Sequence, residues 1–306
     1  MSRHCLPVLF ALAAAALVFV TTARGQVRLG PRGPVIVRPE PKGSSKSRPR
    51  RPAIDRTKPT TFKLTVSPAA EPEPALKYAL LPRFEDLKPG NSTPFYYRAI
   101  LSIKDRPKDP LKPFHDNYDT WMNGPPSQMP RDEVRKFLRG FRNVFHELKI
   151  ATHREKTDWA WRLKDVTGIQ AIAFLLPEVQ EARQVARLLI LRIRLAIAER
   201  RYDDAIASFQ MGYQLARDVA EPPTLINDLV GVSIAQMLTA ELRNMSGTSG
   251  APNMYWALSK MRRPFIDMEP AMRYEMTLPA KVFPALQDAE TADHSPEEWG
   301  RILADA

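Results

Sequence analysis

The sequence is poor in cysteine and glycine. Its 306 residues hold a single cysteine, Cys5, and only 13 glycines. One cysteine close to the N-terminus excludes a disulfide framework, a thiolate metal site and a cysteine nucleophile in the rest of the chain. So few glycines leave little room for loops that cradle phosphates. Neither a nucleotide-binding glycine fingerprint nor a Gly-x-Ser-x-Gly nucleophile elbow is present.

Metal-binding histidine motifs are missing as well. His146 and His153 could share a helix face, but seven residues separate them. That spacing puts the two imidazoles about 10 Å apart along a helix axis, too far for one metal ion. The sequence therefore predicts no catalytic residue, metal site or cofactor. We interpret the remaining polar candidates as caps or solvated surface: His115, Asp116, Asp119, His294, Asp203, Asp204, Glu297 and Glu298.

Acidic residues are scarce near the N-terminus, and the excess of positive charge is local. Residues 26–60 contain ten Lys or Arg and two acidic residues, whereas residues 61–306 contain 33 basic and 32 acidic residues. The formal net charge of +11 therefore does not indicate a basic nucleic-acid-binding fold. Residues 26–60 are rich in Pro, Arg, Lys and Ser, so we expect a disordered tail. It would act as a spacer or bind an anionic envelope polymer or lipid.

The N-terminus carries an apolar run of 16 residues, Cys5–Val20, which follows Arg3. The run is short for a membrane span, and Ala23 and Gly25 fit the small-residue rule for cleavage. The pattern predicts a signal peptide over residues 1–25, cleaved before Gln26, and export to the periplasm or the medium. An uncleaved membrane anchor is the alternative, because arginines follow the run closely.

Short alternating patterns come after the tail. Phe62, Leu64 and Val66 alternate with polar residues, and Leu76, Tyr78 and Leu80 do the same. A period of two is typical of strands, so we expect a small antiparallel pair here. Two strands are not stable alone and would need to lie on helices.

The rest of the chain has helical periodicity, and we expect a mainly α-helical domain over residues 61–284. Residues 285–306 would form a linker and a short helix, which begins with a Ser295/Glu298 capping box. Apolar residues at steps of three and four predict helices in these segments: 93–101, 117–122, 134–148, 178–200, 202–219, 224–242, 251–261 and 271–276.

One helix pair has features of a tetratricopeptide hairpin. Tyr202, Ala205, Phe209 and Gly212 fall at spacings of three, four and three, where such hairpins place small residues and aromatics. The unit would span residues 178–220. The departures are also clear, since Arg200 stands where a turn glycine is usual. The sequence therefore leaves two alternatives open, a generic antiparallel hairpin or a short α-solenoid of stacked hairpins.

Three longer stretches carry a wider resemblance. They read "AEPEPALKYALLPRFEDLKPGNSTPFYYRA", "YDDAIASFQMGYQLARDVAEPPTLINDLVGVSIA" and "APNMYWALSKMRRPFIDMEPAMRYEM". In these stretches the chain resembles an uncharacterised family of exported helical proteins from planctomycete bacteria, over roughly residues 62–284. The resemblance implies export and a mostly helical fold. It implies no activity and no catalytic residue.

Two groups of side chains, one of arginines and one of aromatics, could lie on the surface or have a structural role. Arg183, Arg187 and Arg194 are spaced by four and seven residues, which places them on one ridge of the long helix. That ridge would be a solvated face or would dock an acidic partner. We expect the large aromatics on short segments to be core residues rather than a ligand platform: Trp159, Trp161, Tyr255 and Trp256.

These patterns favour an exported, non-catalytic protein that binds or scaffolds other proteins in the bacterial cell envelope. Stacked hairpins expose extended surfaces, and no catalytic constellation is visible. Two alternatives stay open. One is an envelope hydrolase that uses carboxylates from separate helices. The other is a module that binds an anionic polymer through residues 26–60.

Overall fold

The computed structural model describes residues 77–105, 109–161, 163, 176–282 and 294–304. All of these residues belong to one compact unit, Ser67–Ala306. The expected signal peptide, the basic tail and the expected strand at 62–66 lie outside the described residues, so they stay predictions.

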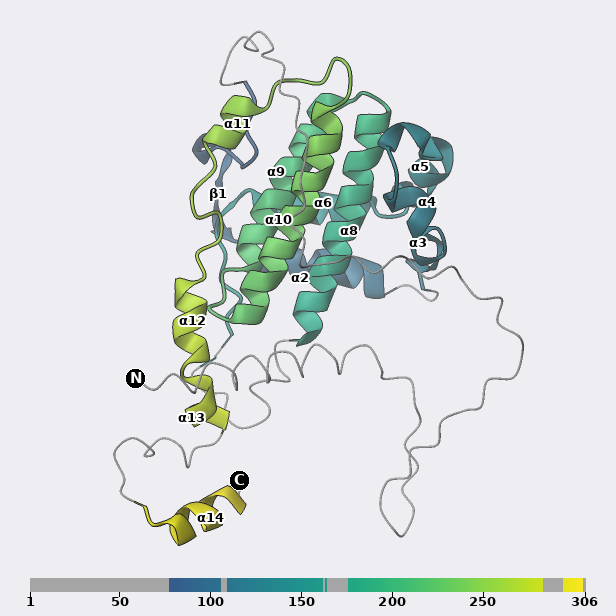
Figure 1. Cartoon of the computed structure of the whole chain (residues 1–306). Coiled ribbons are helices and arrows are strands. Elements are labelled where there is room, and N and C mark those ends of the chain that lie inside the picture. Colours follow the sequence, from purple (N-terminus) through teal and green to yellow (C-terminus); the bar gives the residue numbers. More distant parts are fainter. Residues whose placement is uncertain (1–76, 106–108, 162, 164–175, 283–293, 305–306) are drawn as a thin grey trace, which may run out of the picture. The chain divides into compact units, whose positions relative to one another are not determined.

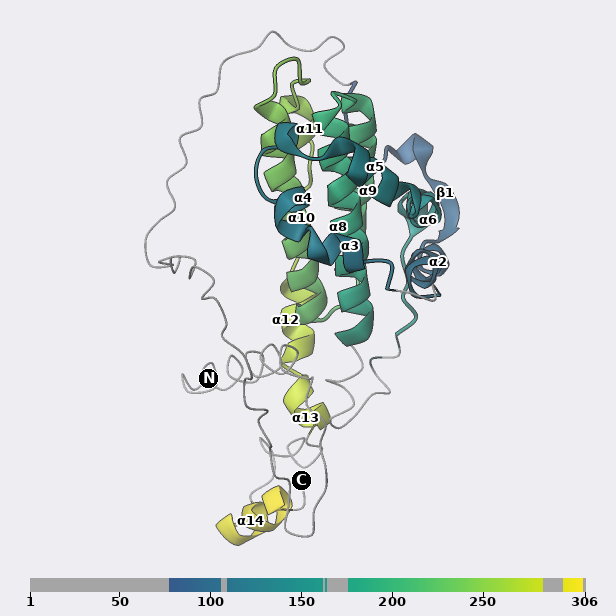
Figure 2. The same ribbon diagram turned by 90° about the vertical axis from the view of Figure 1, so that its right-hand side faces the viewer.

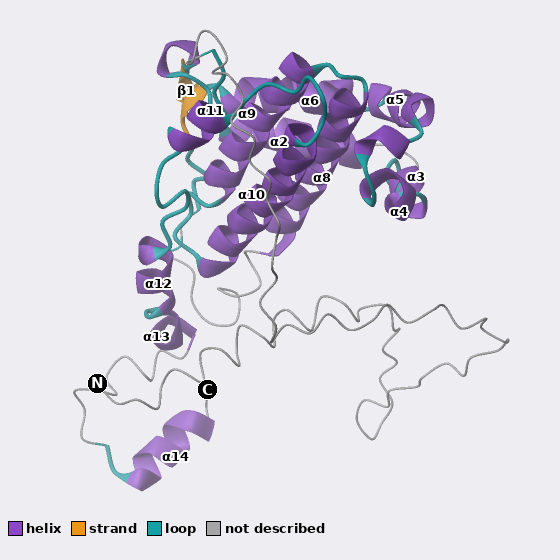
Figure 3. Cartoon of the chain, turned by 45° about the horizontal axis from the view of Figure 1, so that its top comes forward, coloured by secondary structure: helices purple, strands orange, loops and turns teal. Residues whose placement is uncertain are grey.

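Helices dominate the described residues, which confirms the predicted fold class at that level (Figures 1 and 3). Two 3₁₀ turns are η1 (Phe84–Asp86) and η2 (Pro126–Gln128). The α-helices are α2 (Thr93–Lys104), α3 (Lys112–Asp116), α4 (Tyr118–Met122), α5 (Arg131–Arg139), α6 (Arg142–Thr152), α8 (Leu176–Ala198), α9 (Tyr202–Val219), α10 (Leu225–Ser246), α11 (Tyr255–Ser259), α12 (Glu269–Glu275), α13 (Leu278–Val282) and α14 (Pro296–Ala304).

The core is built around α8, α9 and α10, which contact one another and lie side by side in Figures 1 and 2. Helix α8 is buried nearly all round. Helices α2 and α6 pack together, and each also contacts this group. Helix α5 and the turn η2 contact α8, and α12 contacts α10.

Glycines set the close approach of α9 and α10. A Cβ added to Gly212 would lie 2.6 Å from Cδ2 of Leu238 on α10. A Cβ on Gly231 would lie 2.5 Å from the carbonyl oxygen of Ala216 on α9. Neither position has space for a side chain, so both glycines are required by packing rather than by backbone conformation.

Helix α10 is long and apolar enough to cross a membrane by length and composition, alone among the described helices. One of its faces packs into the core through Val230, Ile234 and Leu238, while Leu229 is 42% exposed. A core helix with one buried face has the same composition. The helix is central, since it packs against both α8 and α9, but it is not buried all round.

The chain turns from α8 into α9 through a Schellman motif. The Arg200 N–H donates to the Ile197 carbonyl (3.0 Å) and the Arg201 N–H donates to the Ala196 carbonyl (2.8 Å). This motif requires a left-handed residue, and Arg200 takes that conformation with φ +56°. An arginine therefore occupies a position that glycine adopts without steric cost.

The strand prediction needs correction. A two-stranded sheet exists near the start, but it pairs β1 (Lys88–Asn91) with β2 (Arg154–Lys156), and the strands are parallel. A β-bulge in β1 contains Gly90, whose φ is +112°. The expected antiparallel partner around Tyr78 and Leu80 is irregular. Residues 65 and 66 positions apart in the chain pair here, and alternation alone cannot reveal such a pairing.

The expected helix over 134–148 is two helices. Helix α5 ends at Arg139 and α6 begins at Arg142, with Gly140 and Phe141 between them. Phe141 is 2% exposed and its ring lies 4.9 Å from that of Phe137. The apolar period continues across the break because both segments pack into the same core, so periodicity could not locate the break.

The second hairpin of a repeat array is not formed in the described structure. Helix α10 would supply its first helix, but α11, which would supply the second, has only five residues. At the end of the described chain, α14 begins with the predicted capping box. The Ser295 N–H donates to Glu298 Oε2 (2.8 Å) and the Glu298 N–H donates to Ser295 Oγ (3.3 Å).

Candidate functional site

The expected arginine ridge on α8 is interrupted because Arg194 is buried. Its side chain is 2% exposed and forms an ion pair with Glu241 of α10 at 2.6 Å. The guanidinium also donates to the carbonyls of Trp121 (3.0 Å) and Gly124 (2.6 Å). This corrects the expectation that Arg194 faces a partner, since it ties the segment after α4 to α8 and α10.

The other two ridge arginines are half-buried. Burial lowers the pKa of Arg183, and the charge of Arg187 one turn away lowers it further. No acidic side chain of the described residues pairs with either guanidinium. The two residues remain candidates for a small basic patch on α8.

The hairpin corner residues lie where α9 meets its neighbours. Ala205 and Phe209 are fully buried. A side chain at Gly212 would collide with Leu238 and crowd Leu189, which lie on α10 and α8. Tyr202 is half-buried, and its hydroxyl donates to the Ser249 carbonyl at 3.2 Å. These four positions therefore pack the corner and do not form a binding site, with Tyr202 at its edge.

The corner is also held by charge. Glu199, at the end of α8, accepts from Arg135 of α5 and from Arg201. Burial alone would raise the pKa of Glu199, but these two guanidinium groups outweigh it and lower the pKa. Arg201 in turn pairs with Asp204 in the first turn of α9.

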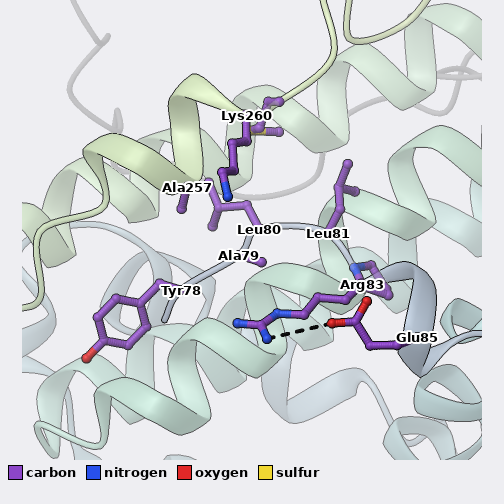
Figure 4. Close-up of a pocket in the computed structure, with 10 residues that line it drawn as sticks. Tyr78, Ala79, Leu80, Leu81, Arg83, Glu85, Ala257 and Lys260 are labelled. Atoms are coloured by element: carbon purple, nitrogen blue, oxygen red, sulfur yellow. Dashed lines mark ion pairs between the residues drawn. The ribbon is translucent and has the colours of Figure 1, made fainter. Parts of the chain in front are cut away.

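Next to this corner lies a groove that the sequence did not predict, here called the Tyr78 groove (Figure 4). It has a volume of about 370 Å³. One wall is the irregular segment before and within η1, and the other is α11 with the two residues that follow it (Figure 4). The lining residues are Tyr78, Ala79, Leu80, Leu81, Pro82, Arg83, Glu85, Ala257, Lys260 and Met261.

A second hollow of about 500 Å³ shares Tyr78 with this groove. It is more polar, and we call it the corner hollow because the α8–α9 corner forms one side. Its lining residues are Lys77, Tyr78, Arg200, Arg201, Tyr202, Asp203, Asp204, Gly250 and Pro252. The two hollows meet at Tyr78. The Tyr78 groove has a mainly apolar lining, whereas the corner hollow holds most of the charged residues.

Large apolar side chains on η1 and α11, the elements that contribute to the Tyr78 groove, are exposed to solvent without lining the groove itself. Phe84 of η1 is 85% exposed, and Tyr255 and Leu258 of α11 are 62% and 42% exposed. Trp256 packs edge-on against Tyr255 with ring centroids 5.1 Å apart. The core prediction is thus right for Trp159, which is 8% exposed, and Trp161 is partly buried against the core. It is wrong for Tyr255 and Trp256, which are 62% and 36% exposed. Clustered exposed aromatics are typical of protein-binding surfaces.

Two aspartates are buried elsewhere in the described structure. Asp218 of α9 accepts from the Tyr96 hydroxyl and from Gln214 Nε2 (2.7 Å), and its backbone carbonyl accepts from the Trp159 indole (2.7 Å). Burial raises the pKa of Asp218 to about 6, although these side-chain donors oppose the change. The network joins α2, α9 and the segment after β2, so its role is structural.

Asp228 is the less satisfied of the two. It lies in the first turn of α10 and is 1% exposed, and its Oδ2 has no hydrogen-bond partner. Burial raises the pKa of Asp228 to about 6, and the charge of Asp267 adds to the effect. Neither Asp218 nor Asp228 lines the Tyr78 groove or the corner hollow.

Metal-ligand geometry is absent from the described part of the chain, where no three His, Cys, Asp or Glu side chains come together. The His153 Nδ1 lies 2.8 Å from the Lys149 carbonyl one turn earlier, and the His115 ring packs against Phe114. Both histidines therefore make local contacts.

We compared the chain with protein-family models, with curated proteins and with solved structures, and nothing matched. The resemblance to the planctomycete family stays a prediction. The functional argument has to come from the surface itself.

Proposed function

We propose that this protein is an exported, non-catalytic interaction protein that binds a protein partner at the Tyr78 groove. One observation carries the proposal. The groove has mainly apolar walls, and three large apolar side chains on the elements that contribute to it, η1 and α11, are 42% to 85% exposed. A monomeric surface rarely holds such side chains together unless they bind something, because their burial is favourable by about 25 cal/mol per Å².

The hydrolase alternative has less support in the described residues. A pair of catalytic carboxylates must reach a substrate. Asp218 and Asp228, the two carboxyl groups with a pKa of about 6, are 5% and 1% exposed. The polymer-binding alternative depends on residues 26–60 and is tested by deleting that segment and measuring salt-sensitive binding.

The tetratricopeptide-like part of the proposal is limited to the hairpin of α8 and α9. Its corner is close to the groove, since residues 200–204 line the corner hollow. We propose that the hairpin serves as a rigid support for the groove rather than as one unit of a concave array. Export of the chain belongs to the same proposal and is tested by N-terminal sequencing of the mature protein.

Site-specific photo-cross-linking tests the proposed function. A photoreactive phenylalanine at Ala79, inside the groove, should give one discrete protein adduct in the native cell envelope. The same group at Met276, which follows α12 and is 67% exposed, is the matched control and should give none. An Ala79→Trp substitution fills the groove and should abolish the adduct formed from a photoreactive group at Tyr255. Equal adducts from Ala79 and Met276 would contradict the proposal.

A further inference from the structure

The unpaired charge that lines the Tyr78 groove and the corner hollow is mainly positive. Arg83 pairs with Glu85 across 3.8 Å, and Arg201 pairs with Asp204. Lys77, Arg200 and Lys260 have no carboxylate partner among the described residues, and each lines one of the two hollows. Asp203 is the single unpaired acid that lines them. The surface is therefore complementary to an acidic partner.

Lys260 lies where its ammonium group can contact a ligand bound in the groove. It follows α11, and its side chain extends toward the wall that holds Ala79 and Leu80 (Figure 4). Ala257, one turn earlier on the same face of the helix, is 4% exposed and closes the base of that side. A carboxylate beside an apolar anchor would meet the Lys260 ammonium while the anchor occupies the groove.

The facing wall offers backbone groups as well. Tyr78, Ala79, Leu80 and Leu81 make no backbone hydrogen bond within the described part of the chain. Leu80 is only 1% exposed, so the partly exposed residues Tyr78, Ala79 and Leu81 are the ones suited to pair with the backbone of another segment.

We infer that the Tyr78 groove takes an acidic peptide segment of a partner protein, with one bulky apolar side chain in the groove and carboxylates beside Lys77, Arg200 and Lys260. This inference rests on the proposed function and adds the chemistry of the partner. The apolar walls distinguish such a segment from a purely anionic polymer, which has nothing to place in the groove.

Peptide selection on the full chain tests the inference. A random twelve-residue peptide library is displayed on phage, selected on the folded protein, and the clones are measured by fluorescence polarisation. We expect the selected sequences to be enriched in Asp and Glu around one Phe, Leu or Trp. Lys260→Glu and Arg200→Glu should each weaken binding on the order of tenfold at low salt. Lys136→Glu, on the exposed side of α5, is the matched control and should have no effect.

The outcomes of these experiments distinguish a failure of the acidic-peptide inference from a failure of the proposed function. Some selected peptides could lose binding to the Ala79→Trp protein and yet lack acidic enrichment, or bind the Lys260→Glu protein as tightly as the parent. Either result would overturn the acidic partner and leave the groove as a binding site. Clones that Ala79→Trp leaves unchanged would overturn the proposed function. Poly-L-glutamate of twelve residues is the second probe. If it binds as tightly as the selected peptides, the apolar anchor is not needed and the inference is wrong.

Discussion

The two regions that flank the helix group α8, α9 and α10 differ in the side chains that they bury and expose. Beside α8, the segment after α4 covers a buried arginine and supplies two of its acceptors, the carbonyls of Trp121 and Gly124. Beside α11, apolar side chains as large as Tyr255 and Phe84 are exposed. The first region buries the Arg194 guanidinium together with its hydrogen-bond acceptors. The second region leaves large apolar side chains exposed to solvent.

The difference separates the stabilising part of the molecule from the part available for binding. A buried ion pair is kept in place because removing one partner leaves the other charged and desolvated. An exposed aromatic contributes little to folding, since its burial would come only from another molecule. Substitutions in the two regions should therefore differ in size and in what they affect.

The largest expected effect is at Arg194. Arg194→Ala should lower the free energy of unfolding by about 3–5 kcal/mol, because Glu241 would stay buried without its cation. Urea denaturation followed by circular dichroism measures the change. Arg187→Ala, seven residues earlier on the same helix, is the matched control, and we expect a change within about 0.5 kcal/mol. A loss at Arg194 no larger than that of the control would show that the buried pair is not needed.

Asp228 should give a smaller effect that depends on pH. The pKa of this carboxyl rises to about 6 in the folded protein, above its ordinary value of 3.8. The folded state then holds more protons than the unfolded state between these values, so stability falls as pH rises from about 4 to about 6. Asp228→Asn removes this loss and should stabilise the protein at pH 7.5 by up to about 3 kcal/mol.

The same substitution should stabilise the protein only about half as much at pH 5, where the folded carboxyl is protonated but the unfolded one is already ionised. Asp218→Asn is the contrasting variant. Asp218 accepts hydrogen bonds from Tyr96 and Gln214, so an amide there loses acceptor capacity and should destabilise the protein. Denaturation curves at the two pH values check both expectations. A stabilised Asp218→Asn protein would contradict the distinction between the two aspartates.

The hairpin corner should respond to a backbone change. Arg200→Gly relieves the left-handed conformation at φ +56° and should stabilise the protein by about 1 kcal/mol. Ala160, with φ +54°, offers a second test of the same effect through Ala160→Gly. Thermal unfolding measures both variants. Destabilisation by both would mean that the unfolded chain gains more freedom than the strain costs.

The smallest effect is expected beside the groove. Tyr255→Ser should change the free energy of unfolding by less than about 0.5 kcal/mol, because the side chain is 62% exposed. Phe209→Ala, which empties a fully buried aromatic position, should cost about 3–5 kcal/mol in the same assay. If Tyr255→Ser is as damaging as Phe209→Ala, the α11 region belongs to the core and not to a binding surface.

The sequence predicted helices and helix caps well where the residues that specify them lie within a few positions of one another. Helix α9 runs over the predicted residues 202–219, and the Ser295/Glu298 capping box is present. Sequence reasoning failed where distant residues decide the outcome. Arg194 appeared solvated because nothing near it in the chain reveals Glu241, 47 residues later. The groove was missed because its two walls are about 175 residues apart in the chain.

The amino-acid sequence by itself determined the helices, their caps and the small residues that let helices approach, because periodicity, capping and side-chain volume act within a few residues. Only the tertiary structure decided which charges are buried, that the two strands are parallel, and that Tyr255 and Phe84 face solvent. Burial depends on what the rest of the chain places against a side chain, and that is a property of the folded protein alone.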